Sequence, residues 1–374
     1  MKTLNYALIG AGFIGKAHSH ALKDLGLFFK TELQPVMHTI CDVVPDLEET
    51  GTRYGWWHCR QDWRKVVADP EIEAVIIATP GLSHKEIVCA AAEAGCHILC
   101  EKPMTVSYED ALLMRQAVQN KPLTAMMGFN YRFIPAVRVI RNMIETDRLG
   151  KILGFSGQYL QDWAIEESVP YIWRMDAKNV GYGPLEVGSH LIDLARYLVG
   201  EFQEVSGFVE TFIKSRRDEN NVAKTVTTDD LSVFNARFEN GAIGVFQAGR
   251  VNSGHKNELS FTIHGTLGSV HFDLKRLNEL QVCLREESGA DMVGYKTISI
   301  TESSHPYMSH WWASGHVIGW ENLFLHLHTD FLNAIAGQPV DIPTFDDGVQ
   351  SHKIVKAVVD SSETHRSVFL KDIL

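Results

Sequence analysis

The chain has 374 residues, of which 45% are hydrophobic and 22% charged, and its formal net charge is −11. The composition is ordinary for a globular protein, and the length predicts two domains because one core rarely grows this large. An acidic chain without clusters of Lys and Arg argues against nucleic acid as a partner. No apolar run approaches the roughly 18 residues of a membrane span, so we expect no membrane partner either.

The six cysteines show no C-x-x-C pairing, and five of them fall in the first 100 residues. In apolar runs such residues are usually small buried thiols, which fits a reducing compartment. Residues 1–4 lead straight into a predicted strand, without the pattern of a signal peptide. We therefore expect a cytoplasmic protein.

A glycine-rich stretch near the N-terminus predicts a dinucleotide-binding turn. An apolar run ends at Gly10, and the spacing G-x-G-x-x-G continues through Gly12 and Gly15 into a predicted helix. The first glycine permits the tight turn, the second lets a pyrophosphate approach the backbone, and the third lets helix and strand pack closely. Free N–H groups and the dipole at the helix start would then hold the anion. A glycine turn without a ligand is the alternative interpretation.

Predicted strands and helices alternate through the first 131 residues. Apolar, strand-like runs at 33–42, 74–78, 97–100 and 123–129 are separated by segments with helical periodicity. This rhythm is typical of a right-handed, doubly wound parallel sheet. We therefore predict an α/β protein in which residues 1–131 form an NAD(P)-binding Rossmann domain.

Asp42 ends the second predicted strand, where an acid would bind the adenosine ribose hydroxyls and favour NAD over NADP. It lies 27 residues after Gly15, longer than the usual spacing of about 20. Residues 26–34 look like an insertion that explains the excess. Alternatively, Asp42 is an acid at the start of the next helix, which Pro45-Asp46 opens. We expect NAD as the cofactor, with NADP less favoured.

Lys102 follows another predicted strand, within the sequence Glu101-Lys102-Pro103. Open α/β sheets bind ligands at the carboxyl ends of their strands, and Pro103 fixes the chain just beyond the lysine. The position alone equally allows a solvated charge at a strand end.

From about residue 151 the pattern changes to strands joined by Gly or Asn turns. Few helices interrupt this run, which predicts a mostly antiparallel sheet in a C-terminal α+β domain. We assign residues 132–374 to this second domain. One face of its sheet should be covered by helices and the other should be apolar enough to need a partner, so we expect a homodimer or homotetramer.

One predicted helix in this half carries polar residues on a single face, at i, i+4, i+7 and i+11: Glu186, His190, Asp193 and Tyr197. A carboxylate one turn before a histidine can orient it and tune its charge. The alternative is a polar helix face that meets water.

Taken in order, these motifs resemble the glucose–fructose oxidoreductase / inositol dehydrogenase (Gfo/Idh/MocA) family. The resemblance covers essentially the whole chain and rests on G-A-G-F-I-G at 10–15, Thr79-Pro80 with His84, Glu101-Lys102-Pro103, and G-S-H-L-I-D at 188–193. Within the family, the motifs around Arg132, Trp163, Trp173 and Tyr197 are most similar to those of levoglucosan dehydrogenase-like pyranose dehydrogenases.

The resemblance implies NAD(P)-dependent oxidation of a secondary hydroxyl of a sugar, anhydrosugar or cyclitol to a ketone. Lys102 would contact the reacting hydroxyl and steady the developing alkoxide. His190 would be the base for oxidation and the acid for reduction, a role suited to a group whose pKa burial and neighbours can move. Glu186 is the third catalytic candidate, although the family usually has an Asp there, whose arm is one methylene shorter.

The resemblance also implies that residues 132–374 form a substrate-binding and oligomerisation domain with an open-faced sheet. It assigns residues to the two ligands as well. The cofactor-binding candidates are Gly10, Gly12, Phe13, Ile14, Gly15, Asp42, Thr79, Pro80, His84, Glu101, Lys102 and Asn130. The substrate-binding candidates are Lys102, Arg132, Trp163, Trp173, Arg174, Glu186, His190 and Tyr307.

Two further sets of residues allow a functional interpretation. Aromatic rings with a polar handle suit the faces of a sugar, although core packing is the alternative for each: Trp163, Trp173, Tyr307, Trp311 and Trp312. Five histidines in the last quarter of the chain match no standard ligand spacing, so we predict no metal: His305, His310, His316, His326 and His328.

Three functions remain open at this point. The first is a carbohydrate dehydrogenase. The second is an NAD-dependent enzyme that cleaves a glycosidic bond through a transient 3-keto sugar, which net NADH production would distinguish from the first. The third is a non-catalytic NAD-dependent sensor, against which Lys102 and His190 argue because a sensor would not need them.

Overall fold

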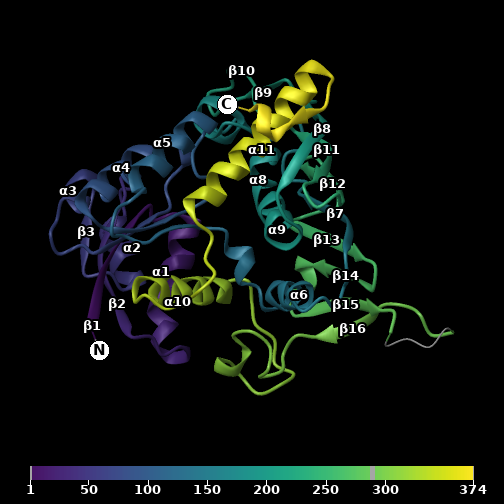
Figure 1. The fold of residues 1–374 in the computed structure, drawn as a ribbon. Helices are drawn as coiled ribbons and strands as arrows, with labels where there is room; N and C mark the ends of the chain where they lie inside the picture. Colours follow the sequence, from purple (N-terminus) through teal and green to yellow (C-terminus); the bar gives the residue numbers. More distant parts are fainter. Residues whose placement is uncertain (1, 287–290, 374) are drawn as a thin grey trace. The chain divides into compact units, whose positions relative to one another are not determined.

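The computed structural model describes residues 2–286 and 291–373, and the chain divides into two compact units (Figure 1). Unit 1 contains the chain up to Phe133 together with Gly319–Val349, and unit 2 contains Ile134–Ile318 together with the chain from Gln350 onward. The predicted boundary after residue 131 lies two residues before the observed one. The return of the chain to unit 1 was not predicted, because nothing in the local pattern of those residues indicates which sheet they join.

Unit 1 is built on a six-stranded, fully parallel sheet in the order β3-β2-β1-β4-β5-β6. The strand order reverses between β1 and β4, which is where doubly wound sheets bind their ligands. All four residues of β4 are buried, as expected for a strand covered on both faces. The strands are β1 (Lys2–Ile9), β2 (Leu33–Cys41), β3 (His58–Arg60), β4 (Ala74–Ile77), β5 (His97–Cys100) and β6 (Ala125–Met127).

Helices cover both faces of this sheet. Figure 1 shows α3, α4 and α5 together on one side and α1 with α10 on the other. The predicted doubly wound Rossmann arrangement is therefore confirmed. The helices of unit 1 are α1 (Phe13–Phe28), α2 (Leu47–Tyr54), α3 (Trp63–Val67), α4 (His84–Ala94), α5 (Tyr108–Val118) and α10 (Asn322–Ile335). Helix α11 (Phe345–Thr364) begins in unit 1 and ends in unit 2.

Unit 2 is built on a nine-stranded sheet in the order β16-β15-β14-β13-β7-β12-β11-β8-β17. Its strands pair antiparallel except for β7 with β12, so the predicted mostly antiparallel sheet is confirmed. The strands are β7 (Ile152–Leu160), β8 (Phe202–Glu210), β11 (Leu231–Phe238), β12 (Ile243–Gly249), β13 (Glu258–Gly265), β14 (Gly268–Asp273), β15 (Glu279–Leu284), β16 (Lys296–Ser299) and β17 (Val368–Phe369). A separate two-stranded ribbon joins β9 (Ser215–Arg217) to β10 (Ala223–Thr225).

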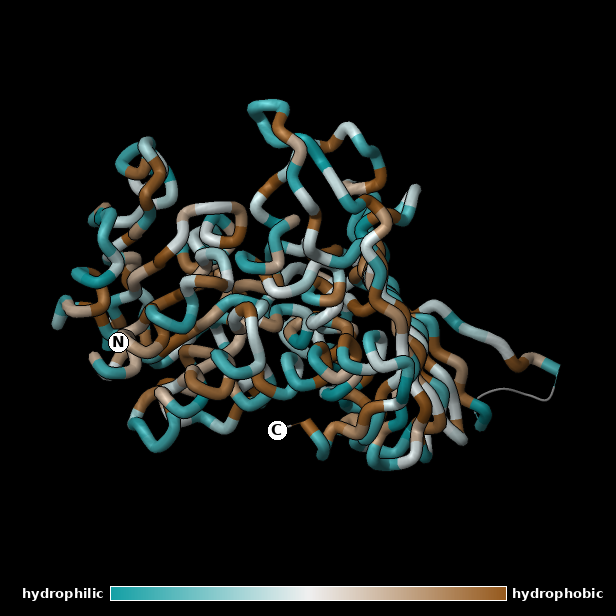
Figure 2. The backbone as a smooth tube through the Cα atoms, turned by 90° about the horizontal axis from the view of Figure 1, so that it is seen from above, coloured by the Kyte–Doolittle hydropathy of each residue, from teal (hydrophilic) through white to brown (hydrophobic). Residues whose placement is uncertain are grey.

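The two faces of this sheet differ in chemistry, and its strands alternate in hydropathy along their length (Figure 2). One face carries stacked rings, among them Phe155, Phe246 and Phe261, and α9 and α6 pack on it. The other face exposes an apolar cluster across β8, β11 and β12: Phe208, Val233, Ile243 and Val245. The helices of unit 2 are α6 (Pro135–Glu145), α7 (Ala177–Val180), α8 (Pro184–Val187) and α9 (Ser189–Val199).

Candidate active site

Two of the three glycines in the first loop, Gly10 and Gly15, occupy positions where a side chain would clash with the loop. Gly10 has φ +106°, and a Cβ there would lie 2.6 Å from the carbonyl of Ala78. A Cβ on Gly15 would lie 2.0 Å from the carbonyl oxygen of Gly10, so this glycine lets α1 pack against the loop. Around Gly12, by contrast, the space is open, as a pyrophosphate approaching the backbone requires. The loop therefore fits a dinucleotide.

The surroundings of this loop also suit an anion. No side chain caps α1 at Gly12, so the helix start offers its amides and its dipole to a phosphate. Asp42 accepts hydrogen bonds from the amides of Ala11 and Val43, both at 2.6 Å, which places its carboxylate beside the loop. The residue at the N-cap of α2 is Asp46, so the structure does not support the alternative that Asp42 starts the helix. Phe13 is exposed and stacks on Trp320, whereas Ile14 is half-buried.

His84 is completely buried and joins two of the predicted cofactor segments. Its Nε2 lies 2.7 Å from the carbonyl oxygen of Thr79, and its Nδ1 lies 3.1 Å from that of Pro103. Burial lowers the pKa of the imidazole, against the opposing effect of these carbonyls. His84 thus fixes the loop of Thr79 and Pro80 relative to the turn that follows Lys102.

Glu101 belongs to a buried side-chain network in unit 1 that sequence reasoning missed. Its Oε1 lies 3.1 Å from Nε2 of His18, whose Nδ1 lies 2.9 Å from Nε2 of His328. Burial, and then the neighbouring charge of His18, hold the pKa of His328 well below its usual range. His18 therefore links the Glu101 carboxylate to His328 through its two ring nitrogens. The signal was weak, because 310 residues separate the two histidines.

Lys102 lies two residues after the end of β5 and is half-buried, and its amide donates to Oε2 of Glu101 at 3.2 Å. The predicted position at the carboxyl end of a sheet strand is therefore confirmed. Asn130 is buried close after β6. Arg132 is buried too, and its guanidinium pairs with Asp347 at the start of α11, at 2.9 Å.

In unit 2, Glu186 and His190 are both buried, on α8 and α9 respectively. The prediction of one helix for both residues is wrong, because the chain leaves the helix at Gly188. The ring of His190 lies 6.2 Å from that of Tyr159, whose hydroxyl donates to Asn257 at 2.7 Å. Oε1 of Glu186 lies 3.9 Å from Nδ1 of His352 on α11. A polar helix face that meets water is therefore wrong for these two residues. His352 was missed because 166 residues separate it from Glu186.

The predicted sugar-stacking residues occupy the loops of unit 2. Trp163 and Trp173 are exposed, so core packing does not account for either ring. The indole of Trp163 donates to Gln161 at 2.9 Å, and the guanidinium of Arg174 lies 4.3 Å from the centroid of the Trp173 ring. Tyr307 is half-buried and has φ +66°.

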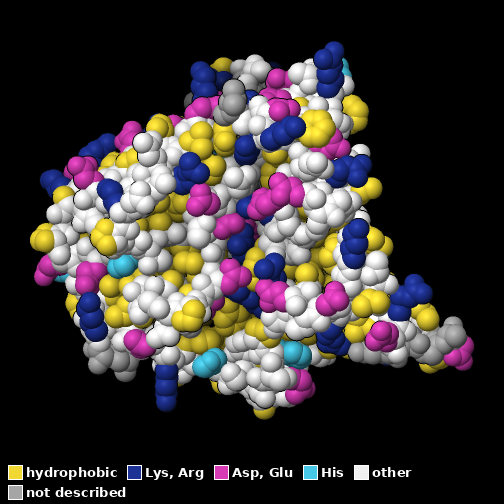
Figure 3. Space-filling model, in the orientation of Figure 1, with side chains coloured by type: hydrophobic (Ala, Val, Ile, Leu, Met, Phe, Trp, Pro, Cys, Tyr) yellow, Lys and Arg dark blue, Asp and Glu magenta, His cyan; other side chains and the backbone are white. Residues whose placement is uncertain are grey.

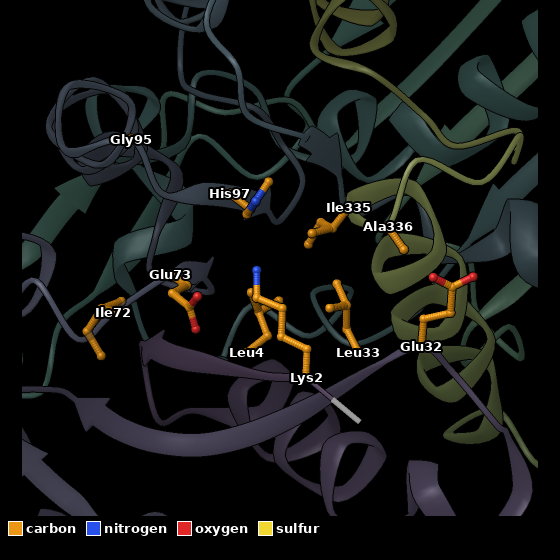
Figure 4. Close-up of a pocket in the computed structure, with 10 residues that line it drawn as sticks. All are labelled: Lys2, Leu4, Glu32, Leu33, Ile72, Glu73, Gly95, His97, Ile335 and Ala336. Atoms are coloured by element: carbon orange, nitrogen blue, oxygen red, sulfur yellow. The ribbon is translucent and has the colours of Figure 1, made fainter.

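Features elsewhere in the described residues add no competing site. They contain no cluster of His, Cys, Asp or Glu placed to hold a metal, and none of their helices is long and apolar enough to cross a membrane. On the face shown in Figure 3, acidic and basic side chains are interspersed. A cavity of about 490 Å³ lies at the amino ends of the unit 1 strands (Figure 4), where Glu73 and His97 already bind Asn5 and Thr124.

A parallel sheet with this glycine loop defines a dinucleotide-binding protein. Residues 4–129 match the family model of oxidoreductases with an NAD-binding Rossmann fold, and residues 137–271 match the GFO/IDH/MocA C-terminal domain. The chain belongs to the Gfo/Idh/MocA family of NAD-binding oxidoreductases.

Individual relatives agree over nearly the whole chain. Levoglucosan dehydrogenase of Pseudarthrobacter phenanthrenivorans is 40% identical over 97% of each chain. Two solved structures of levoglucosan dehydrogenase are each 39% identical. The complex with NADH has a TM-score of 0.95 and covers 99% of both chains, and the complex with NADH and levoglucosan has a TM-score of 0.94 and covers 98% of this chain and 99% of the other. The resemblance inferred from the motifs is therefore confirmed.

Proposed function

We propose that this protein is an NAD-dependent dehydrogenase that oxidises one secondary hydroxyl of a pyranose or anhydrosugar to a ketone. The observation that carries the proposal is that Glu186 and His190 are both buried in unit 2. The exposed rings of Trp163 and Trp173 lie close to them in the sequence, and the ring of His190 lies next to that of Tyr159 near the end of β7. The likeness to levoglucosan dehydrogenase, with a solved complex holding NADH and levoglucosan, supports the substrate class.

The chemistry divides between the two units. NAD, when bound, supplies the acceptor for the hydride that leaves the carbinol carbon. His190 takes the proton of the reacting hydroxyl, since hydride departs only as that proton is removed. The ammonium group of Lys102 stabilises the negative charge that develops on the oxygen. Glu186 holds His190 in the orientation for proton transfer, and Trp163 and Trp173 offer faces on which the sugar stacks.

The cofactor site is formed by the first loop and the strand ends of unit 1. The glycine loop binds the pyrophosphate. Asp42 accepts hydrogen bonds from the ribose hydroxyls, because its oxygens retain lone pairs beyond those that bind the amides of Ala11 and Val43. A 2′-phosphate beside this carboxylate would be repelled, which favours NAD over NADP. His84 acts on the dinucleotide through the two loops that it joins, because its own ring is completely buried.

The assembly is a homodimer or homotetramer. The apolar cluster of Phe208, Val233, Ile243 and Val245 lies on the outward face of the nine-stranded sheet, and burying it against a second copy would remove this surface from water. All six cysteines are free thiols, which supports a reducing, cytoplasmic location.

The test is NADH formation from NAD with a panel of pyranoses, anhydrosugars and inositols. We expect net NADH with at least one pyranose or anhydrosugar and a keto sugar as the product. A substrate whose glycosidic bond is cleaved without net NADH would instead favour the route through a transient 3-keto sugar. Binding of sugar and NAD without any turnover would favour a sensor.

A further inference from the structure

Two neighbouring aspartates in unit 2, Asp229 and Asp230, are almost completely buried just before strand β11. Burying a carboxylate is costly unless hydrogen-bond donors or opposite charges surround it. Two of the donors to Asp229 come from the segment that carries Glu186, and the cation that pairs with Asp230 lies near Trp163. Sequence reasoning did not identify either aspartate, because each acts on residues distant in the chain.

Asp229 faces helix α8, which carries Glu186. Its Oδ1 accepts from the amide of Gly183 at 2.6 Å, and its Oδ2 accepts from the amide of Leu185 at 3.1 Å and from the hydroxyl of Ser232 at 2.8 Å. Amides in the first turn of a helix have no partner within the helix. The approach is close, because a Cβ on Gly183 would lie 2.4 Å from the carbonyl oxygen of Asp229. The carboxylate therefore fixes the turn from which Glu186 projects.

Asp230 has a separate set of hydrogen-bond donors. Its Oδ1 accepts from Nε of Arg250 at 2.9 Å, and its Oδ2 accepts from the amides of Phe212 and Ile213 at 2.8 and 2.9 Å. The side chains of this ion pair are only 1% and 3% exposed. The guanidinium carbon of Arg250 lies 5.8 Å from the centroid of the Trp163 ring. Asp230 thus fixes the cation that lies beside the first sugar-stacking candidate.

A second buried arginine, Arg216, binds the backbone of the segment that follows Trp163. The guanidinium of Arg216 donates to the carbonyl oxygens of Glu166 at 2.6 Å and Val169 at 3.1 Å, and also to that of Ala164. The amide of Ala164 in turn donates to the carbonyl of Arg250 at 3.1 Å. The backbone beyond Trp163 is therefore anchored at several points rather than free to move.

We propose that Asp229 and Asp230 are positioning residues with separate tasks: Asp229 places Glu186, and through it His190, for proton transfer, and Asp230 places Trp163, through Arg250, for sugar binding. This inference rests on the proposed function. It predicts opposite kinetic signatures for two adjacent carboxylates, which a merely structural role would not produce.

The first variant is Asp229→Asn. The amide keeps the shape of the side chain but offers a donor where the carboxylate accepted, so one of the amides of Gly183 and Leu185 loses its partner. A displacement of about 1 Å in a catalytic group can cost about 10²-fold in rate, so we expect kcat to fall about 10- to 100-fold. KM for the sugar should stay within about threefold, and the pH profile of kcat should shift because the orientation of His190 changes. Ser232→Ala removes one donor only, and should lower kcat severalfold in the same manner.

The second variant is Asp230→Asn, with Arg250→Lys as its partner if the asparagine variant does not fold. Both disturb the guanidinium beside Trp163, so we expect KM for the sugar to rise about tenfold while kcat stays within about threefold. Asp218→Asn is the matched control, because Asp218 also accepts from two backbone amides, those of Asn220 and Val222, but in the turn between β9 and β10. It should keep wild-type kinetics.

Glu186→Ala distinguishes the inference from the function on which it rests. If Asp229 acts by placing Glu186, then Asp229→Asn should cost little further in a Glu186→Ala background. Full activity of Glu186→Ala would overturn the proposed role of Glu186 itself. Loss of activity in Glu186→Ala, combined with wild-type kcat in folded Asp229→Asn or in Ser232→Ala, would overturn only the positioning role. Equal kcat and KM effects in Asp229→Asn and Asp230→Asn would overturn the separation of tasks.

Discussion

The candidate site of unit 1 is formed mainly by backbone, whereas that of unit 2 is formed mainly by buried side chains. In unit 1 the shape of the cofactor loop depends on backbone, because Gly10, Gly12 and Gly15 have no side chain to fill the loop or to block the ligand. In unit 2 the substrate residues are placed by buried side chains, such as Asp229, which reaches across 46 residues to Gly183. A site made of backbone is encoded within one turn of sequence, whereas a site made of side chains needs partners that only the fold brings together.

The two sites should also be damaged by different kinds of substitution. A backbone site is damaged by added atoms, because they meet either the loop itself, as at Gly15, or the path of the ligand, as at Gly12. A side-chain site is damaged by the loss of a charge or a hydrogen bond, because its groups are buried and depend on their partners. Substitutions of the two kinds should therefore have separable effects on cofactor binding and on turnover.

The largest expected effect is on turnover, in Lys102→Ala and His190→Ala. Each removes a group proposed to act on the reacting hydroxyl, so kcat should fall by roughly 10² to 10⁴. NAD affinity should change far less than kcat, because neither side chain belongs to the glycine loop proposed to bind the pyrophosphate. Steady-state kinetics with NADH detection and direct titration of NAD measure the two quantities.

Exposed residues of the same types provide the controls for these two variants. Lys275→Ala, whose partner is Glu258, and His316→Ala should leave kcat unchanged. Full activity of Lys102→Ala would contradict the dehydrogenase mechanism as written, whatever the behaviour of His190→Ala.

A smaller effect separates two glycines of one loop. Gly15→Ala places a Cβ 2.0 Å from the carbonyl oxygen of Gly10, so the loop must move, and we expect a loss of roughly 1–3 kcal/mol in stability. Gly12→Ala meets open space, so the protein should melt like wild type and yet bind NAD more weakly, since the methyl group occupies the path of the pyrophosphate. Thermal unfolding without cofactor, followed by NAD titration, distinguishes the two. If Gly12→Ala binds NAD as wild type does, the pyrophosphate does not approach this glycine.

Much of unit 1 could be predicted from the sequence, for the same reason that its loop is local. The strand and helix alternation gave the correct sheet class, and the glycine spacing located the turn. The place of α10 beside α1 could not be predicted, because helical periodicity shows that a face is buried and not what covers it. The network of Glu101, His18 and His328 was missed for the same reason.

Unit 2 was predictable in its class and only partly in its site. A run of strands joined by turns, with few helices between them, indicated an antiparallel sheet. Glu186 and His190 were recognised from their spacing and from the resemblance to a family, although the single helix predicted for them is divided into α8 and α9. The anchors of this site were not recognised, because Asp229, Arg250 and His352 are polar residues in unremarkable local sequence. A buried aspartate and a solvated one look alike until the fold brings donors to the first of them.

The smallest expected effect concerns the buried side-chain network of Glu101, His18 and His328 in unit 1. It tests whether unit 1 also depends on buried side chains. Burial holds the pKa of His328 well below its ordinary value, so the folded protein keeps this imidazole neutral. Once pH falls below about 6.5, the unfolded chain binds a proton at this histidine that the folded chain does not. Stability is therefore present above about pH 6.5 and is lost as pH falls, by about 1.4 kcal/mol per pH unit for each such group.

His84 contributes in the same direction, since burial lowers its pKa as well. His328→Gln retains an amide near the position of Nε2 but does not titrate, so it should remove one proton's share of the acid-dependent loss and leave that of His84. Hydrogen exchange of the amides of β1 and α10, measured between about pH 7 and pH 5.5 and corrected for intrinsic rates, reports on unit 1 by itself. The absolute stability of His328→Gln is not the readout, because the substitution also disturbs the packing against Tyr6. The slope against pH is the readout, and His316→Gln, at an exposed position, should leave it unchanged. An unchanged slope in His328→Gln would mean that His328 does not govern the acid sensitivity of unit 1. The stability of unit 1 would then depend less on its buried side chains than the network of Glu101, His18 and His328 indicates.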